Sequence, residues 1–117
     1  MLKEEYLLGN PLQIDSDKYI DIEEPGVLIN HSCEPNAGIA NTTTLIALTD
    51  ITQHTQIFFD YSTTMSDGLW IMNCACSSIH CRKIIEDFHL LPELLKEKYL
   101  KMAIVQDYIV REHAAKA

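Results

Sequence analysis

The four cysteines and one histidine-containing turn are the residues of this chain whose types and spacing could do chemistry. The segment NHSCEPN, residues 30–36, places an imidazole, a thiol and two amide side chains in one turn. The other three cysteines form a C-x-C-x4-C pattern over residues 74–81. Zinc takes four soft or borderline ligands in a tetrahedron, and three from one tight loop plus one from a distant segment can supply them. The pattern predicts a structural zinc site with the ligands Cys33, Cys74, Cys76 and Cys81.

Other interpretations of the cysteines remain open from the residues alone. The thiols could be small buried hydrophobic side chains, they could pair in two disulfides, or His80 could replace one of them as a ligand. The N-terminal residues MLKEEYLLGNPLQ are acidic where a signal peptide would be basic, and they contain no long apolar run. We therefore expect an intracellular protein, cytoplasmic or nuclear in a eukaryote, with reduced thiols. Reduced, clustered cysteines favour metal.

Length and composition indicate one ordinary globular domain. The 117 residues are 47% hydrophobic and 22% charged, without an internal repeat, and a chain of this length can bury one core. No apolar run approaches the ~18 residues that a membrane-spanning helix needs, so no membrane association is expected. The formal charge of −8 argues against zinc-finger-like DNA binding, because contact with a phosphate backbone needs concentrated positive charge. A basic peptide or protein is the easier partner to accommodate.

Short strands must position the residues of the turn. An alternating pattern predicts a strand over residues 18–22, after an irregular segment over residues 1–17. Runs of β-branched and aromatic residues predict strands over 42–51 and 57–62, which we expect to pair as a hairpin or as neighbours. This arrangement places Asp60 and Tyr61 at the end of a strand.

The C-terminal part of the chain, from residue 74 onwards, lacks the strand patterns and shows two other features. Residues 74–81 are too short and too rich in cysteine for a helix or a strand, which favours a ligand-bearing knuckle. From Leu91 onwards, apolar residues recur at three- and four-residue spacing. That spacing predicts an amphipathic helical tail that packs on the domain or on a partner.

Three motifs in this order, NHSCEPN, IFFDY and CACSSIHC, resemble the C-terminal half of a SET domain followed by a post-SET zinc knuckle. The resemblance covers about residues 18–83. SET proteins are lysine methyltransferases that use S-adenosylmethionine, and the resemblance implies their fold: mainly β with α, in small sheets around a knot-like crossing. The implied division is an irregular segment (1–17), a partial SET domain (18–66), a post-SET zinc-binding segment (67–83) and a helical extension (84–117).

The resemblance also implies roles for single residues. Asn30 and His31 match the pair that contacts the cofactor through side chain and backbone, and Tyr61 matches the catalytic tyrosine whose hydroxyl borders the lysine channel. Trp70 matches an aromatic residue that covers the cofactor, although it could equally belong to the core. The four cysteines match the post-SET metal ligands. In the family's fold the FDY strand passes beside the Asn-His turn, so Asn30, His31 and Tyr61 are expected to meet.

Structural roles compete with these assignments. His31 taken alone would be a core histidine satisfied by a backbone carbonyl, and Tyr61 could cap a strand end with its hydroxyl in water. We expect Asp60 to accept hydrogen bonds from nearby backbone amides rather than to act as a base. The acidic residues of segment 21–24 are expected to form a solvated turn.

One part of the family pattern is not found. The N-terminal half of a SET domain contains a G-x-G segment close to the cofactor, whereas Gly9 has no partner glycine. A second copy could rebuild that wall, so we expect a homodimer. Two hypotheses follow. The chain is either an S-adenosylmethionine-dependent methyltransferase acting on a lysine of a protein or basic peptide, or a non-catalytic zinc-stabilised module that binds a partner.

Overall fold

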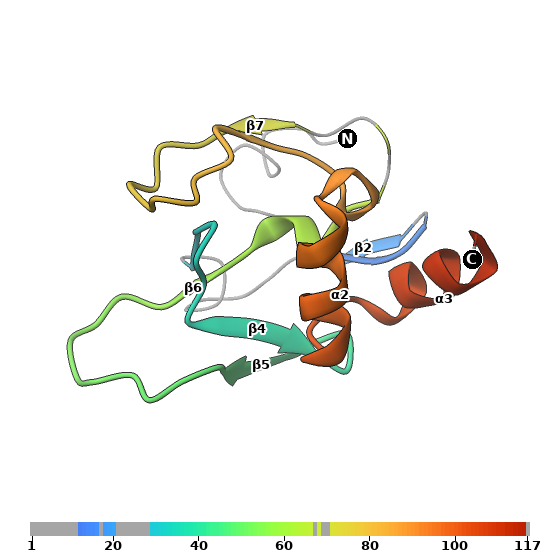
Figure 1. The fold of residues 1–117 in the computed structure, drawn as a ribbon. Helices are drawn as coiled ribbons and strands as arrows, with labels where there is room; N and C mark the ends of the chain where they lie inside the picture. The colour runs from blue at the N-terminus through green and yellow to red at the C-terminus, as the bar shows by residue number, and fades with distance from the viewer. Residues whose placement is uncertain (1–11, 17, 21–28, 67, 69–70, 117) are drawn as a thin grey trace.

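The residues that the structure describes form four two-stranded sheets and two C-terminal helices (Figure 1). The structure is a computed structural model, and it describes residues 12–16, 18–20, 29–66, 68 and 71–116. The strands are β1 (Leu12–Asp15), β2 (Lys18–Ile20), β3 (Asn30–His31), β4 (Ala37–Ala40), β5 (Thr44–Ala47), β6 (Phe58–Phe59), β7 (Met72–Asn73) and β8 (Ile84–Ile85). The helical segments are the 3-10 turns η2 (Tyr61–Thr64) and η3 (Phe88–Leu90) and the helices α2 (Glu93–Lys101) and α3 (Asp107–Lys116). These small sheets with helices confirm the predicted mixed class of β with α.

A parallel pairing brings the two motifs that carry chemistry side by side. Strand β3 lies against β6, with Asn30 opposite Phe58 and His31 opposite Phe59. The backbone N–H of Ser32 extends this pairing by donating to the carbonyl of Phe59 at 3.2 Å. Because Tyr61 follows β6 after one residue, it is placed beside the Asn-His turn.

The predicted pairing of the strands within 42–51 and 57–62 is wrong. Strand β5 pairs antiparallel with β4, while β6 pairs with β3. The β4–β5 hairpin closes through a tight turn in which Asn41 and Thr42 have positive φ angles of 50° and 71°. A short local connection costs less chain entropy than the longer loop that a β5–β6 hairpin would need.

The segment predicted to be irregular contains strand β1, which pairs antiparallel with β2. The predicted strand over 18–22 is observed as Lys18–Ile20, and residues 21–24 lie outside the described residues. Gln13 in β1 is fully buried. Its side-chain oxygen accepts from the N–H of Ser66 at 3.0 Å, and its carbonyl accepts from the side chain of Gln106 at 2.8 Å. Polar contacts to distant residues therefore hold β1, which is why a local pattern did not predict it.

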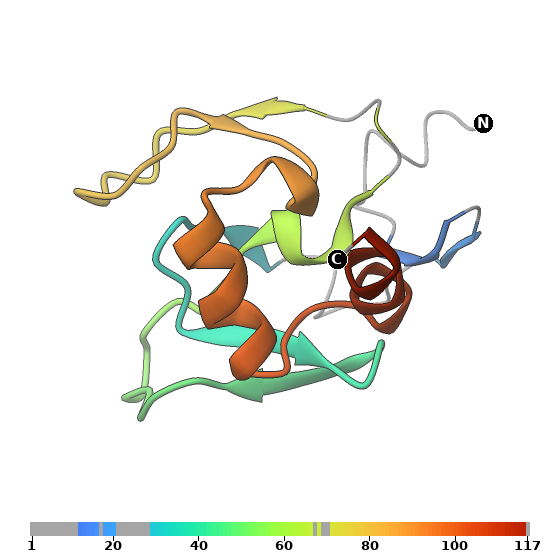
Figure 2. The same ribbon diagram turned by 45° about the vertical axis from the view of Figure 1, so that its right-hand side comes forward.

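The helical tail packs on its own domain as two helices. Ala103 has a φ of 58°, a left-handed conformation that ends helices, and its N–H donates to the carbonyl of Leu100 at 3.1 Å. The chain then turns into α3. Figures 1 and 2 show the end of α2 beside the β4–β5 hairpin and α3 beside the β1–β2 hairpin. No helix in the part of the chain that the structure describes is long and apolar enough to cross a membrane.

The core between the tail and the sheets is filled by aromatic and branched side chains. The buried cluster consists of Phe88, Leu91, Tyr99, Ile104, Val105, Tyr108 and Ile109. Ile104 contacts the hairpin so closely that a Cβ on Gly38 would lie 2.6 Å from its Cγ2 atom. A residue without a side chain is thus required where β4 meets the connection between the helices.

Candidate metal centre and cofactor site

The four cysteine sulfurs come together at one point, as the sequence predicted. All four lie within 4.8 Å of one another, and none forms a disulfide. Tetrahedral zinc with Zn–S bonds of about 2.3 Å separates its sulfurs by about 3.8 Å, so the donor set and its spacing fit this ion. The alternative of two disulfides is therefore wrong, while Cys33 is also a buried member of the core cluster against which the other three cysteines pack. The exposed His80 is not part of the group.

Two distant segments build this cluster. Cys33 follows β3, whereas the other three cysteines lie on the loop between the antiparallel strands β7 and β8. The N–H of Cys74 donates to the carbonyl of Lys83 at 2.7 Å and closes the base of the loop. Ser78 at the tip donates through its hydroxyl to the carboxylate of Glu34. The first bond thus closes the loop, and the second holds its tip beside the NHSCEPN turn.

The surroundings shift the pKa values of two of the four thiols in opposite directions. Burial raises the pKa of the Cys33 thiol to about 12. Burial also opposes ionisation of Cys76, but backbone hydrogen bonds with Cys33 and Ser78 outweigh it and lower the pKa of Cys76 to about 6. Thiolates are the form that binds metal. Cys76 is thus prepared as a ligand, while Cys33 must lose its proton when an ion binds.

Asn30, His31 and Tyr61 meet as expected. The backbone N–H of Tyr61 donates to Nδ1 of His31 at 3.0 Å, and the two rings pack edge to face with centroids 5.3 Å apart. The Tyr61 hydroxyl donates to the carbonyl of Ile29 at 2.7 Å. Burial lowers the pKa of His31 and raises that of Tyr61. Both side chains are therefore neutral near pH 7.

A cavity of about 450 Å³ opens beside these residues. Its walls are Asn30, His31, Phe58 and Tyr61 on one side and residues 72–76 of the cysteine loop on the other. This volume lies within the usual range for sites of small ligands, roughly 300–1,000 Å³. Trp70, the predicted cover of the cofactor, lies outside the described residues.

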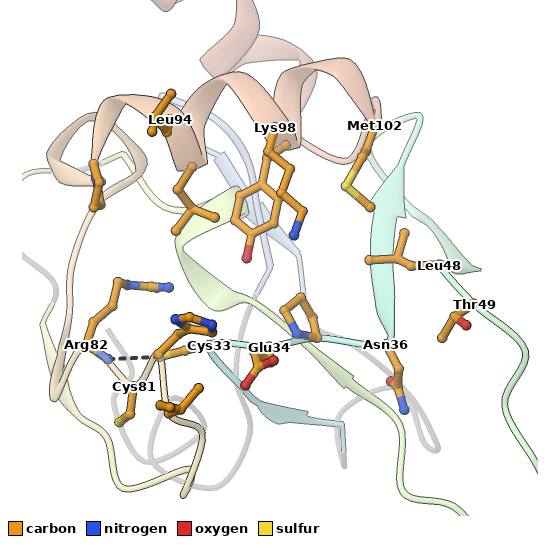
Figure 3. Close-up of a pocket in the computed structure, with 16 residues that line it drawn as sticks. Cys33, Glu34, Asn36, Leu48, Thr49, Cys81, Arg82, Leu94, Lys98 and Met102 are labelled. Carbon is orange, nitrogen blue, oxygen red and sulfur yellow. Dashed lines mark hydrogen bonds between the residues drawn. The ribbon is translucent and has the colours of Figure 1, made fainter.

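A larger groove of about 1020 Å³ lies between α2 and the NHSCEPN turn (Figure 3). Its lining includes Cys33, Cys81 and Arg82 on one wall and Leu94 and Lys98 of α2 on the other, but none of Asn30, His31 and Tyr61. By volume alone, this groove would be the first choice as the cofactor site. The smaller cavity is the better candidate for a cofactor because the predicted cofactor and catalytic residues line it.

The carboxylate of Asp60 joins three parts of the fold. The Asp60 residue is 1% exposed, and its carboxylate accepts hydrogen bonds from the two terminal guanidinium nitrogens of Arg82, at 2.8 and 2.9 Å. It also accepts the hydroxyl of Tyr99 in α2 at 2.8 Å and the N–H of Ser62 at 3.0 Å. The predicted role of Asp60 as an acceptor from nearby backbone amides is confirmed. Its side chain also ties the cysteine loop and α2 to the end of β6.

Sequence reasoning missed Arg82 and Tyr99. Arg82 directly follows Cys81 and could have been noticed as a cation beside a metal loop, whereas Tyr99 belonged to the apolar stripe of the tail. Burial opposes the charge of Arg82, but hydrogen bonding to Asp60 outweighs it and raises the pKa of the guanidinium. Burial and then the charge of Asp60 raise the pKa of Tyr99. Both residues therefore keep their protons and donate to the carboxylate.

A comparison with known protein families gives a match to the first half of the chain. The family model described as SET domain covers residues 5–62, which include the β3–β6 pair, Asn30, His31 and Tyr61. The match begins earlier than the segment from about residue 18 on which the resemblance rested, and the cysteine loop follows it. No curated protein matches the chain. The division of the chain at residues 66 and 83 stays a prediction.

Proposed function

We propose that this chain, whose residues 5–62 are a SET domain, transfers a methyl group from S-adenosylmethionine to a lysine side chain of a protein or peptide. SET domains form a family of S-adenosylmethionine-dependent protein-lysine methyltransferases. The observation that carries the proposal is the parallel β3–β6 pair, which sets Asn30, His31 and Tyr61 around one cavity beside a four-cysteine cluster. The formal charge of −8 favours a basic peptide as substrate.

The residues of the cavity suit such a transfer. The cofactor supplies an electrophilic methyl group on a sulfonium, so the protein must orient a neutral amine and exclude water. A desolvated channel lowers the pKa of the substrate lysine and lets its proton leave without a strong protein base. Tyr61 is neutral near pH 7, and burial raises its pKa further. Its hydroxyl donates a hydrogen bond to the Ile29 carbonyl and presents its oxygen to the amine as an acceptor. The exposed amide of Asn30 is assigned to the cofactor, and Trp70 keeps its predicted role as the cover.

Equilibrium binding of S-adenosylmethionine to the purified chain tests the proposal. We expect a micromolar dissociation constant by isothermal titration calorimetry. Asn30→Ala should weaken binding about tenfold, since a hydrogen bond contributes about 0.5–1.5 kcal/mol. Gln53→Ala, in an exposed loop, is the control and should leave the constant unchanged. An intact chain that does not bind the cofactor at millimolar concentration would instead support the non-catalytic module.

Metal analysis tests the assignment of the cysteines as zinc ligands. We expect one zinc ion per chain by mass spectrometry of the purified protein, and Cys81→Ser should lose it because three thiolates leave the tetrahedron open. Chelation should increase amide hydrogen exchange over residues 71–85. His80→Asn is the control and should retain the metal, and loss of zinc in that variant would contradict the ligand set. The expected homodimer stays a prediction that the mass of the purified chain in solution tests.

A further inference from the structure

The imidazole of His31 has a partner at each ring nitrogen. Nδ1 accepts the backbone N–H of Tyr61 at 3.0 Å, and Nε2 lies 3.5 Å from the sulfur of Cys33. The side chain is 2% exposed, so it has little access to water. His31 therefore stands between the cysteine cluster and the backbone of the proposed catalytic tyrosine.

These contacts determine which nitrogen carries the proton. A backbone N–H can only donate, so the lone pair of Nδ1 is taken by Tyr61 and a neutral ring must carry its proton on Nε2. The Nε2–H group then points at the Cys33 sulfur. Nδ1 also lies 3.6 Å from Asp60 Oδ1, which would be an ion pair only if Nδ1 held a proton. The N–H of Tyr61 is the closer partner, and Asp60 is supplied with donors by Arg82, Tyr99 and Ser62.

A second N–H reaches the same sulfur. The backbone of Arg82 donates to Cys33 Sγ at 3.3 Å, drawn as the dashed line in Figure 3. The guanidinium of Arg82 binds Asp60, the residue before Tyr61. Cys33 is thus linked to the Asp60–Tyr61 segment by two routes, one through the ring of His31 and one through Arg82.

We propose that His31 is a positioning residue that couples the metal site to the cofactor cavity. Its side chain bonds to Cys33 and to the backbone of Tyr61 rather than to the cofactor. The part of this inference that concerns the cavity rests on the proposed function. Within the role implied by the family resemblance, a contact through side chain and backbone of the Asn-His pair, it leaves only the backbone of His31 for the cofactor. Donors to a metal-bound thiolate stabilise its charge and orient it, and loss of such an outer partner typically weakens metal affinity about 10- to 100-fold.

Two substitutions separate the two contacts. The side-chain oxygen of His31→Asn can replace Nδ1 as an acceptor, but this variant has no donor for Cys33. The amide of His31→Gln can replace the Nε2–H donor, but this variant has no acceptor for Tyr61. We expect His31→Asn to lower zinc affinity about 10- to 100-fold in competition with a chromophoric chelator. It should also shift the sulfur-to-cobalt charge-transfer band of the Co²⁺-loaded chain. His31→Gln should keep the zinc affinity and the charge-transfer band near their wild-type values but shift the amide proton resonance of Tyr61.

Coupling itself is measured by removing the metal. Loss of zinc should move the Tyr61 amide resonance in the wild-type chain and move it less in His31→Asn. His54→Asn, an exposed histidine in a loop, is the matched control and should behave as wild type in every measurement. Unchanged metal affinity and charge-transfer band in His31→Asn would overturn the proposal.

One measurement does not depend on whether the variants fold. The ¹⁵N chemical shifts of the His31 ring in the zinc-loaded wild-type chain report its tautomer. A proton on Nε2 is expected, and a proton on Nδ1 would overturn the proposal. None of these readouts uses S-adenosylmethionine. Failure to bind the cofactor would therefore contradict the proposed function, whereas the contact of His31 with the metal site is tested independently.

Discussion

Asp60→Asn is expected to lower the free energy of unfolding by about 3–5 kcal/mol, because it removes one partner of a buried ion pair. The Asp60 side chain is 0% exposed, and its oxygens receive the guanidinium of Arg82 at 2.8 Å. Asparagine has nearly the same size, so the loss comes from charge rather than from a cavity. The substitution leaves Arg82 with an uncompensated charge and gives Tyr99 a weaker acceptor. Urea denaturation followed by circular dichroism measures the change.

Exposed charges supply the controls for this experiment. Asp50→Asn, at an exposed position, should change stability by less than about 0.5 kcal/mol. Glu93→Gln breaks the ion pair between the exposed Glu93 carboxylate and the half-buried Lys96 and should cost only about 0.3–0.5 kcal/mol. Replacing both buried partners, Asp60→Asn with Arg82→Met, should recover part of the loss because no unpaired charge remains. An Asp60→Asn chain within about 1 kcal/mol of wild type would contradict the assigned importance of the pair.

Tyr61→Phe is expected to reduce turnover about 10²- to 10³-fold, the usual cost of removing one preorganised polar group at the reacting centre. Phenylalanine keeps the ring that packs on Phe59, with centroids 4.9 Å apart, and on His31 at 5.3 Å. The backbone N–H that donates to His31 is unchanged. The cofactor's dissociation constant should therefore stay within about twofold of wild type, since less than 0.5 kcal/mol separates such values. Methylation of a lysine peptide and calorimetry measure the two quantities.

Tyr108 offers a matched control. It is also buried, and its hydroxyl donates to the backbone carbonyl of Thr64 at 2.9 Å. It does not line the candidate cofactor cavity. Tyr108→Phe should therefore cost about 1 kcal/mol of stability through the lost hydrogen bond and leave turnover unchanged. Parallel losses of cofactor binding and turnover in Tyr61→Phe would show that Tyr61 is a structural residue.

The sequence by itself was enough to predict the four-cysteine cluster and the meeting of the Asn-His turn with Tyr61. Ligand chemistry explains the first success, because thiols clustered in a polar loop have few uses other than holding a metal. The second was implied by the resemblance of the motifs to a SET domain, and the match of residues 5–62 to that family supports the resemblance. Apolar periodicity also predicted the helical tail, since its buried positions recur at helical spacing.

The tertiary structure alone decided the partners of each polar group. The contacts of Gln13 in β1 with Ser66 and Gln106, and those of Asp60 with Arg82 and Tyr99, join residues far apart in the chain. So does the bond between His31 and the N–H of Tyr61. The residue types show which side chains can donate or accept a hydrogen bond. They do not show which donor pairs with which acceptor, because any donor of suitable geometry can bond to a given acceptor. The choice among donors depends on which segments the folded chain brings within hydrogen-bonding distance, and no local pattern in the sequence encodes that distance.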